Sequence, residues 1–177
     1  RRQNPTVNHI TNSYDGRSIR SLTYKNKNGA FTTRSCMPDH DYMENCTMVS
    51  GRFINDKDIS GYRKVCVMGK PVQDALFEKE EPVGKYINVD GVPFKVIGTF
   101  TDPGRGDNER IYIPVSTAQR AFNGQDKLSV IWLSTGSVGV DESELMAKNI
   151  RQLLAKKYNF DPKDEEAVNV WNNSVEY

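Results

Sequence analysis

The stretch that decides the expected fold reads MVSGRFINDKDI at residues 48–59, KVCVMGKPVQDALF at 64–77, EPVGKYINVDGVPFKVIGTF at 81–100 and RIYIPVSTAQRAF at 110–122. The first block predicts a glycine turn and then a single helical turn capped by Asn55 or Asp56. The second predicts a short apolar strand that leads into a helix. The third predicts a hairpin around Asp90-Gly91, and the fourth a strand followed by a helix that Ser116 caps.

The sequence before this stretch predicts further strands. Residues 18–25 and 30–35 are expected to pair across a turn at residues 26–29, because Asn28-Gly29 readily takes the positive φ of a tight hairpin. Residues 38–45 begin at a proline and predict a short helix.

The sequence after it predicts a strand at 128–133, an amphipathic helix and a final strand at 167–171. Asp141 and Glu144 are interpreted as a capping pair for this helix. Its expected apolar side consists of Leu145, Met146, Ile150, Leu153 and Leu154. The order of these elements predicts an α+β fold of two lobes.

The composition excludes several classes of protein. Lys and Arg total 24 against 23 Asp and Glu, which gives a formal charge of +1. This near balance of positive and negative charge argues against a nucleic-acid-binding protein and against electrostatic docking on an anionic membrane. No apolar run approaches the ~18 residues that cross a bilayer, and no signal peptide opens the chain. Because the chain starts at Arg1 without an initiator Met, we interpret it as a piece of a longer protein, with a mature secreted protein as the alternative.

The cysteines and histidines predict no catalytic or metal site. Cys36 and Cys46 lie ten residues apart and could be bridged, whereas Cys66 alternates with valines in a strand and is expected to be a small buried hydrophobe. His9 and His40 lack the ligand spacing of a zinc site. His40 lies between two aspartates and could serve as a base for a cysteine nucleophile, but a surface position is favoured. We therefore predict a non-catalytic chain without a metal or cofactor.

Three polar motifs have structural interpretations. The loop that contains Asp102, Asp107, Asn108 and Glu109 does not follow the ligand spacing of a calcium loop. Gly69-Lys70 precedes a helix, but a proline follows it where a phosphate-binding loop needs Ser or Thr. In the Gly51-Arg52-Phe53 motif, we expect a glycine where a side chain would clash, a buried Phe, and an Arg paired with Asp56 or Asp58.

Together, five motifs resemble the periplasmic core domain of MacB-type ABC transporter permeases, a family that includes the FtsX-like permeases. They are G-R-F, V-x-V-x-G with a following L-F, P-V-G-K, P-F-x-V-I-G and I-Y-I-P-x-S-T-A-Q. The resemblance is strong over residues 48–122 and weaker to Tyr177. The signature positions, interpreted as structural, are Gly51, Arg52, Phe53, Gly69, Leu76, Phe77, Gly84, Gly98 and Pro114.

The resemblance implies a porter-like βα lobe built from residues 1–35 and 125–177, and an inserted β-rich lobe at 36–124. It implies a domain on the periplasmic face of the bacterial inner membrane, in a homodimeric permease that exports antibiotics, peptides or lipoproteins. ATP would be bound by a separate cytoplasmic domain or subunit, and a periplasmic adaptor and an outer-membrane channel are expected partners. The domain itself would transmit motion and perform no chemistry.

Two further expectations remain open. Long irregular loops often carry binding residues, so the proposed partner contacts are Arg105, Asp107, Asn108 and Glu109. The alternative to the transporter is a free secreted ligand-binding module. Such a module would be expected to show clustered aromatic residues, and the tyrosines of this chain are scattered.

Overall fold

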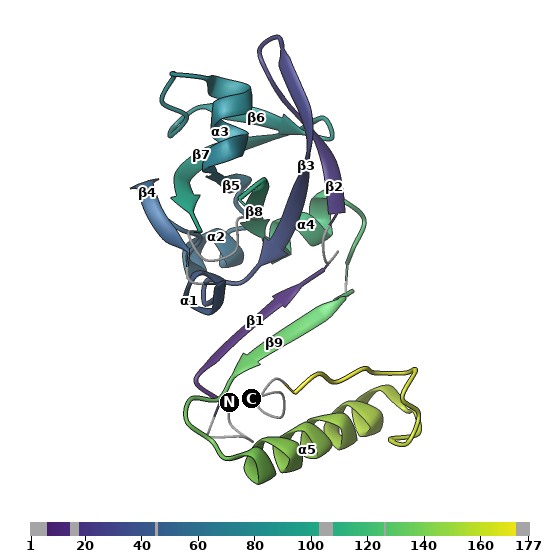
Figure 1. Cartoon of the computed structure of the whole chain (residues 1–177). Coiled ribbons are helices and arrows are strands. Elements are labelled where there is room, and N and C mark those ends of the chain that lie inside the picture. The colour runs from purple at the N-terminus through teal and green to yellow at the C-terminus, as the bar shows by residue number, and fades with distance from the viewer. Residues whose placement is uncertain (1–6, 15–17, 45, 103–107, 126, 173–177) are drawn as a thin grey trace. The chain divides into compact units, whose positions relative to one another are not determined.

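The computed structural model describes residues 7–14, 18–44, 46–102, 108–125 and 127–172, and the chain folds as two compact units. One unit consists of residues 9–133 and is here called the barrel unit. The other combines residues 1–8 with 134–177 and is called the chain-end unit. Figure 1 shows the elements of both units along the chain. Strands and helices together give the α+β class that the sequence predicts.

The barrel unit is built on a seven-stranded sheet in the order β4-β7-β5-β8-β3-β2-β6. The strands are β2 (Ser18–Tyr24), β3 (Lys27–Cys36), β4 (Thr47–Gly51), β5 (Val65–Gly69), β6 (Tyr86–Val89), β7 (Val92–Thr101) and β8 (Arg110–Pro114). The first half of β7 pairs with β6, which also pairs with β2, so six of these strands close into a barrel. The second half of β7 pairs with β4 on the same edge.

The barrel interior and one outer face hold separate apolar clusters. The interior cluster includes Cys66 and Met68 of β5 and Ile111 of β8, and helix α3 (Lys70–Phe77) adds its own apolar face. The outer cluster takes the alternate residues Val67 and Tyr112 of the same two strands. Side chains on a strand point alternately to its two faces, so β5 and β8 are buried on both. This explains why both strands read as nearly continuous apolar runs.

Short helices cover the barrel. They are α1 (His40–Glu44), α2 (Asp56–Ser60) and α4 (Val115–Ala121). The Asn55 side chain accepts hydrogen bonds from the backbone N–H of Lys57 and Asp58, so Asn55 is the N-cap of α2, as expected. The β6–β7 hairpin turns at Asp90 and Gly91 with φ of 48° and 83°, which confirms the prediction for that dipeptide.

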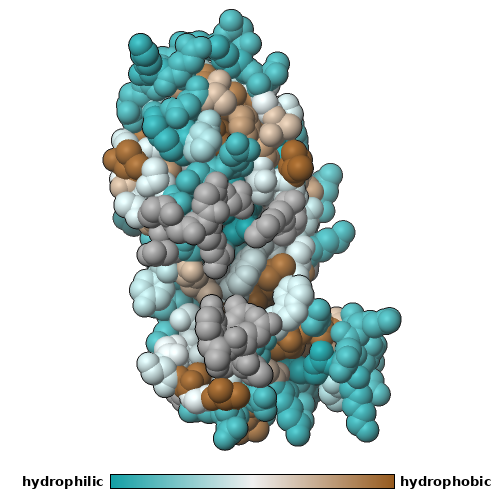
Figure 2. Space-filling view, viewed as in Figure 1, coloured by the Kyte–Doolittle hydropathy of each residue, from teal (hydrophilic) through white to brown (hydrophobic). Residues whose placement is uncertain are grey.

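The end of the barrel unit that carries α3 and the β2–β3 turn has a mostly hydrophilic surface (Figure 2). Opposite charges are paired there: Lys25 Nζ lies 3.0 Å from the Glu80 carboxylate, and Lys27 pairs with Glu78.

Two strands and one helix lie outside the seven-stranded sheet and the helices that cover it. Strands β1 (His9–Ser13) and β9 (Val130–Ser134) form a two-stranded sheet. Helix α5 (Val140–Tyr158) is the main element of the chain-end unit.

The unit boundaries differ from the expected lobes. Residues 18–35 were expected in the porter-like lobe, but β2 and β3 pair with β6 and β8 and therefore belong to the barrel. The β2–β3 turn lies at Lys25 and Asn26, with Lys25 at φ 51°, so residues 27–29 are part of β3 and not of the turn. The pairing of the long strands fixes this register, which overrides the Asn-Gly signal.

Three predictions at helix and strand ends are wrong. Pro114 is the N-cap residue of α4, and Ser116 instead donates its Oγ hydrogen to the Ile59 carbonyl at 2.7 Å. Helix α5 follows Gly139, so Asp141 lies inside its first turn and forms no cap. Residues 167–171 form no strand. On α5, Met146 is buried, but Leu145 and Leu153 are exposed, so the expected apolar face is not buried as a whole.

Candidate functional site at the base of the 102–109 loop

The Gly51-Arg52-Phe53 motif fixes a close crossing of β4 and β7. Gly51 has φ 70°, and a Cβ there would lie 2.2 Å from the Ile97 carbonyl oxygen. Phe53 is buried against Tyr112. The Arg52 guanidinium contacts Asp58 at 2.6 and 3.1 Å. The expected clash, burial and ion pair are therefore all confirmed.

Asp58 is fully buried, and its charge is stabilised by its neighbours. Burial alone would raise the pKa of this carboxyl. The hydrogen bonds from Arg52 and from the Asn55 N–H, with the charges of Arg52 and Arg63, outweigh burial and lower the pKa of Asp58 below its usual value. The motif thus anchors α2 to the barrel.

Other signature positions also have structural roles, in core packing, close strand contact or a turn. Leu76 and Phe77 of α3 are buried in the interior cluster. A Cβ on Gly98 would lie 2.4 Å from the Arg52 carbonyl oxygen, so Gly98 belongs to the crossing of β4 and β7. Gly84 lies just before β6 with φ 91°.

The loop after β7 is fixed at its base by one amide side chain. Asn108 Oδ1 accepts a hydrogen bond from the Asp102 N–H at 2.6 Å, and its Nδ2 donates to the Asp102 carbonyl at 3.3 Å. A Cβ on Gly69 would lie 1.8 Å from the Asn108 carbonyl oxygen. Gly69 therefore allows the loop to return against the end of β5.

Asp102, at the base of this loop, belongs to a buried network of ions. Arg110, which is 1% exposed, contacts Asp102 at 3.1 Å and Glu44 at 3.6 Å. Arg34 contacts the other oxygen of Glu44 at 3.0 Å. Two strands, one helix and the loop base therefore meet through two positive and two negative side chains. Such a network is expected to hold its partners in one arrangement, because any unpaired charge there would be buried.

His40 adjoins the network and is 1% exposed. Its ring lies 5.1 Å from the ring of Tyr112 and 5.5 Å from that of Trp132, both edge-on. Burial, reinforced by the charges of Arg34 and Arg110, lowers the pKa of His40 to about 3. His40 is therefore a neutral, buried ring at neutral pH, which corrects the expected surface position.

The cysteines do not form a nucleophile with His40. All three are free, and burial raises the pKa of Cys36 and Cys46. Because the thiolate is the reactive species, a raised pKa disfavours a nucleophilic role for these thiols. Cys66 is buried in the interior cluster, as expected. Among the described residues, no group of three or more His, Cys, Asp or Glu is arranged to hold a metal ion.

The proposed partner contacts divide into three groups. Arg105 and Asp107 lie outside the described residues. Asn108 is half-buried and binds the loop base, whereas Glu109 is exposed. Sequence reasoning missed Arg34, Glu44 and Arg110 as a network. The signal for Arg110 was its place at the start of an otherwise apolar strand, directly after a polar loop.

The chain-end unit has an open groove of about 540 Å³. It runs between α5 and the segment that follows it, and Lys148, Arg151 and Glu165 are among the residues that line it. Arg151 donates to the carbonyls of Asp164 and Val168, so it holds that segment against α5. The charged residues that line the groove are mixed in sign and indicate no particular ligand. Among the described residues, no helix is long and apolar enough to cross a membrane.

A comparison with protein families decides what kind of domain this is. A family model described as the MacB-like periplasmic core domain matches residues 1–153. The chain belongs to this family. The resemblance inferred from the five motifs is thereby confirmed, and it extends to residues before the motifs as well.

Curated relatives match this chain over most or much of its length, but the match covers only a small part of each relative. The macrolide export ATP-binding/permease protein MacB of Bdellovibrio bacteriovorus is 26% identical over 171 residues, which cover 94% of this chain and 26% of the relative. The pyoverdine export ATP-binding/permease protein PvdT of Pseudomonas syringae is 33% identical over 117 residues, or 62% of this chain and 18% of the relative. The chain thus spans about a quarter or less of the curated relatives it matches.

Solved structures share the fold. The periplasmic region of MacB from Actinobacillus actinomycetemcomitans aligns with a TM-score of 0.75 and 22% identity over 87% of this chain and 69% of that one. The extracellular domain of the ABC-type transporter YknZ from Gram-positive bacteria aligns with a TM-score of 0.77 and 20% identity, over 89% of this chain and 80% of that one. These likenesses show the fold of a MacB-like periplasmic domain.

Proposed function

We propose that this chain is the extracytoplasmic domain of an ABC transporter permease and that it transmits motion between cytoplasmic ATP hydrolysis and the periplasm during export. The proposal rests on family membership, since curated relatives carry the names of ATP-binding/permease export proteins. We infer that the domain itself is not catalytic and binds no cofactor, because its buried titratable groups serve packing and ion pairing. ATP would be bound by a separate domain or subunit.

The observation that carries the mechanical role is the path of the chain. It leaves the chain-end unit after Asn8 and returns to it at Ser134, and the connecting segments are the paired strands β1 and β9. A domain inserted in this way is attached at two points, so a displacement of the chain-end unit reaches the barrel unit through both strands. We propose that this motion changes contacts with a second permease copy, a periplasmic adaptor and an outer-membrane channel. The exported substrate would be an antibiotic, a peptide or a lipoprotein.

The test uses the parent permease with its ATPase, expressed in bacteria that lack their own exporters. One variant replaces residues 18–124 by a short Gly-Ser linker. We expect this variant to lose export of macrolides and peptides and to retain ATP hydrolysis. The control is Lys79→Ala, an exposed residue, which should export like the parent. Export by the linker variant at the parental rate would refute the mechanical role.

The location of the domain is tested separately. Protease added outside spheroplasts should cleave the domain in the intact parent protein, and protection of the domain would refute an extracytoplasmic position.

A further inference from the structure

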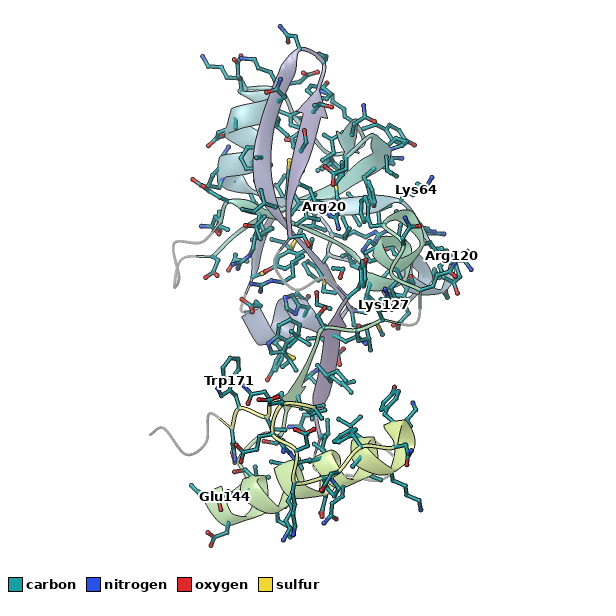
Figure 3. The ribbon with its side chains drawn as sticks, turned by 90° about the vertical axis from the view of Figure 1, so that its right-hand side faces the viewer. Arg20, Lys64, Arg120, Lys127, Glu144 and Trp171 are labelled. Carbon is teal, nitrogen blue, oxygen red and sulfur yellow. The ribbon has the colours of Figure 1, made fainter. Side chains whose placement is uncertain are left out.

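Basic side chains from four separate segments converge on helix α4. The Thr117 hydroxyl donates to the Arg63 carbonyl at 2.8 Å, and Gln119 Nε2 donates to the Lys127 carbonyl at 2.7 Å. Helix α4 therefore holds the α2–β5 connection on one side and the segment after the helix on the other. The basic residues placed there, here called the α4 collar, are Arg20, Arg63, Lys64, Arg120 and Lys127. Figure 3 shows the four of them that it labels on one side of the barrel unit.

The surroundings of the collar are poor in acidic residues. Residues 59–73 contain no Asp or Glu, and residues 110–140 contain only Asp126, which lies outside the described residues. Lys64, Arg120 and Lys127 are exposed and form no ion pair with any described residue. At the hydrophilic end of the unit, by contrast, lysines such as Lys25 are paired with glutamates. The collar therefore carries three exposed cations that form no ion pair with a described residue, although the whole chain carries only +1.

The two carboxylates that form ion pairs with collar arginines are already engaged. Asp90 receives the Arg20 guanidinium and the Ser21 N–H, each at 2.9 Å. Asp58 is buried, and it contacts Arg52 at 2.6 Å and Arg63 at 3.6 Å. Neither carboxylate is available to neutralise the exposed cations of the collar.

Two arginines of the collar are held in fixed orientations. The guanidinium carbon of Arg120 lies 3.2 Å from the centre of the Tyr62 ring, and that of Arg20 lies 3.7 Å from the centre of the Phe122 ring. A planar guanidinium stacked on an aromatic ring loses less freedom when it binds. Its donors form a fork that matches the two oxygens of a carboxylate. Leu128 follows Lys127 and is 48% exposed, which offers an apolar contact beside the charges.

We propose that the α4 collar binds an acidic segment of a partner polypeptide, with its carboxylates on Lys64, Arg120 and Lys127 and an apolar side chain against Leu128. A polypeptide is favoured over a membrane because one segment with carboxylates and an apolar side chain would match both the fork of the stacked Arg120 guanidinium and the exposed Leu128. The inference rests on the proposed function in one respect, that the domain acts by contact with other proteins.

The test is a binding titration with the whole chain and a fluorescent peptide of Glu, Asp and Leu, compared with the same peptide in Gln and Asn form. We expect Lys64→Glu/Arg120→Glu/Lys127→Glu to bind the acidic peptide at least about tenfold more weakly, because each exposed pair contributes a small factor. The matched control is Lys148→Glu/Lys156→Glu/Lys163→Glu on the chain-end unit, which changes the net charge equally. It should bind within about twofold of the parent. The milder Lys64→Gln/Arg120→Gln/Lys127→Gln variant should weaken binding in the same direction, and circular dichroism confirms that each variant is folded.

Three results would overturn the proposal. Equal binding of the acidic and amide peptides, or an equal loss in the control variant, would show that the collar is not the site. Binding to phosphatidylglycerol vesicles without binding to the peptide would assign the collar to the membrane. Self-association that only the collar variant abolishes, again without peptide binding, would assign it to a second copy. None of these titrations involves ATP hydrolysis or export, so their failure leaves the proposed transport role to its own test.

Discussion

The barrel unit buries charged side chains among their partners, whereas the main helix of the chain-end unit leaves much of its apolar side exposed. In the barrel unit, Arg110 is 1% exposed and Asp58 is fully buried, each in contact with opposite charge. In the chain-end unit, Leu145 is 58% exposed and Leu153 42%, although both lie on its main helix. Burying an ion is unfavourable unless its partners are fixed in place, and only a closed, well-packed unit can fix them.

This difference indicates that the barrel unit is stabilised by its own residues. In the chain-end unit, by contrast, α5 gains little from packing among the described residues, and a helix needs a packed apolar face for most of its stability. The two tryptophans allow the comparison to be measured. Trp132 belongs to the barrel unit and Trp171 to the chain-end unit. A Trp171→Phe background therefore makes fluorescence report on the barrel alone.

The largest expected effect is the response of the barrel to acid through His40. Its pKa in the folded chain is about 3, below the ordinary 6.5. As the pH falls below 6.5, the unfolded chain takes up a proton on this residue and the folded chain does not. The stability that depends on neutral His40 is therefore complete above pH 6.5 and is lost towards pH 3. The full difference amounts to about 5 kcal/mol.

The measurement is urea unfolding of the parent and of His40→Phe between pH 7 and pH 3, followed by Trp132 fluorescence. His40→Phe lacks the titrating ring, so the stability of the parent relative to this variant should fall by several kcal/mol over that range. The carboxylates titrate in both proteins and cancel in the difference. Parallel stability curves would contradict the assignment.

The next effect is on the ion network. Arg110→Met removes the charge that lies between Asp102 and Glu44, and it leaves the buried Asp102 and the partly buried Glu44 with less compensation. We expect the free energy of unfolding of the barrel to fall by about 3–5 kcal/mol, the range for breaking a buried pair. The control is Arg120→Met, which removes an exposed guanidinium stacked on Tyr62 and should change stability by less than about 1 kcal/mol. Equal effects in urea unfolding would mean that the network does not stabilise the barrel.

A smaller effect is expected at the base of the loop. Gly69→Ala places a Cβ 1.8 Å from the Asn108 carbonyl oxygen, so the backbone has to move. We expect a loss of about 1–3 kcal/mol, which is typical of overpacking. Amide hydrogen exchange should be faster at Asp102, whose N–H binds Asn108. Unchanged exchange at Asp102 would show that Gly69 does not position the loop.

Much of the barrel could be predicted from local signals. The Asp90-Gly91 hairpin, a cap at Asn55 or Asp56 and an apolar strand at 64–68 each depend on a few neighbouring residues. The structure confirms the hairpin, assigns the cap to Asn55 and has the strand at Val65–Gly69. The ion network could not be predicted, because Arg34, Glu44 and Arg110 are far apart in the sequence and meet only through the pairing of β3 with β8. The same pairing explains why residues 18–35 belong to the barrel unit and not to the predicted porter-like lobe.

The errors in the chain-end unit have a different cause. Asp141 and Glu144 match a capping pattern, and Leu145 and Leu153 match an apolar face, but the helix begins one residue after Gly139 and much of that face is unburied. Such patterns report what a segment could do, while the start of a helix also depends on what packs against it. Because few described residues pack against α5, helix propensity and sequence pattern alone were insufficient to predict where it begins and which of its side chains are buried.

The smallest effect tests the chain-end unit by itself. Gly139 is the N-cap residue of α5, with extended backbone and no side-chain cap, and a Cβ there would meet no neighbouring atom within 4 Å. Gly139→Ser should add a hydroxyl acceptor for the first turn and stabilise α5 by a few tenths of a kcal/mol, seen as slower amide exchange there. The control is Gly136→Ser, where φ is 63° and a Cβ would lie 2.6 Å from Asn8 Nδ2, so strain should weaken the unit. Because the barrel unit is stabilised by its own residues, Trp132 should report the same unfolding free energy in both variants. A matching shift at Trp132 would mean that the two units unfold together, and the contrast between them would then concern burial alone and not independent stability.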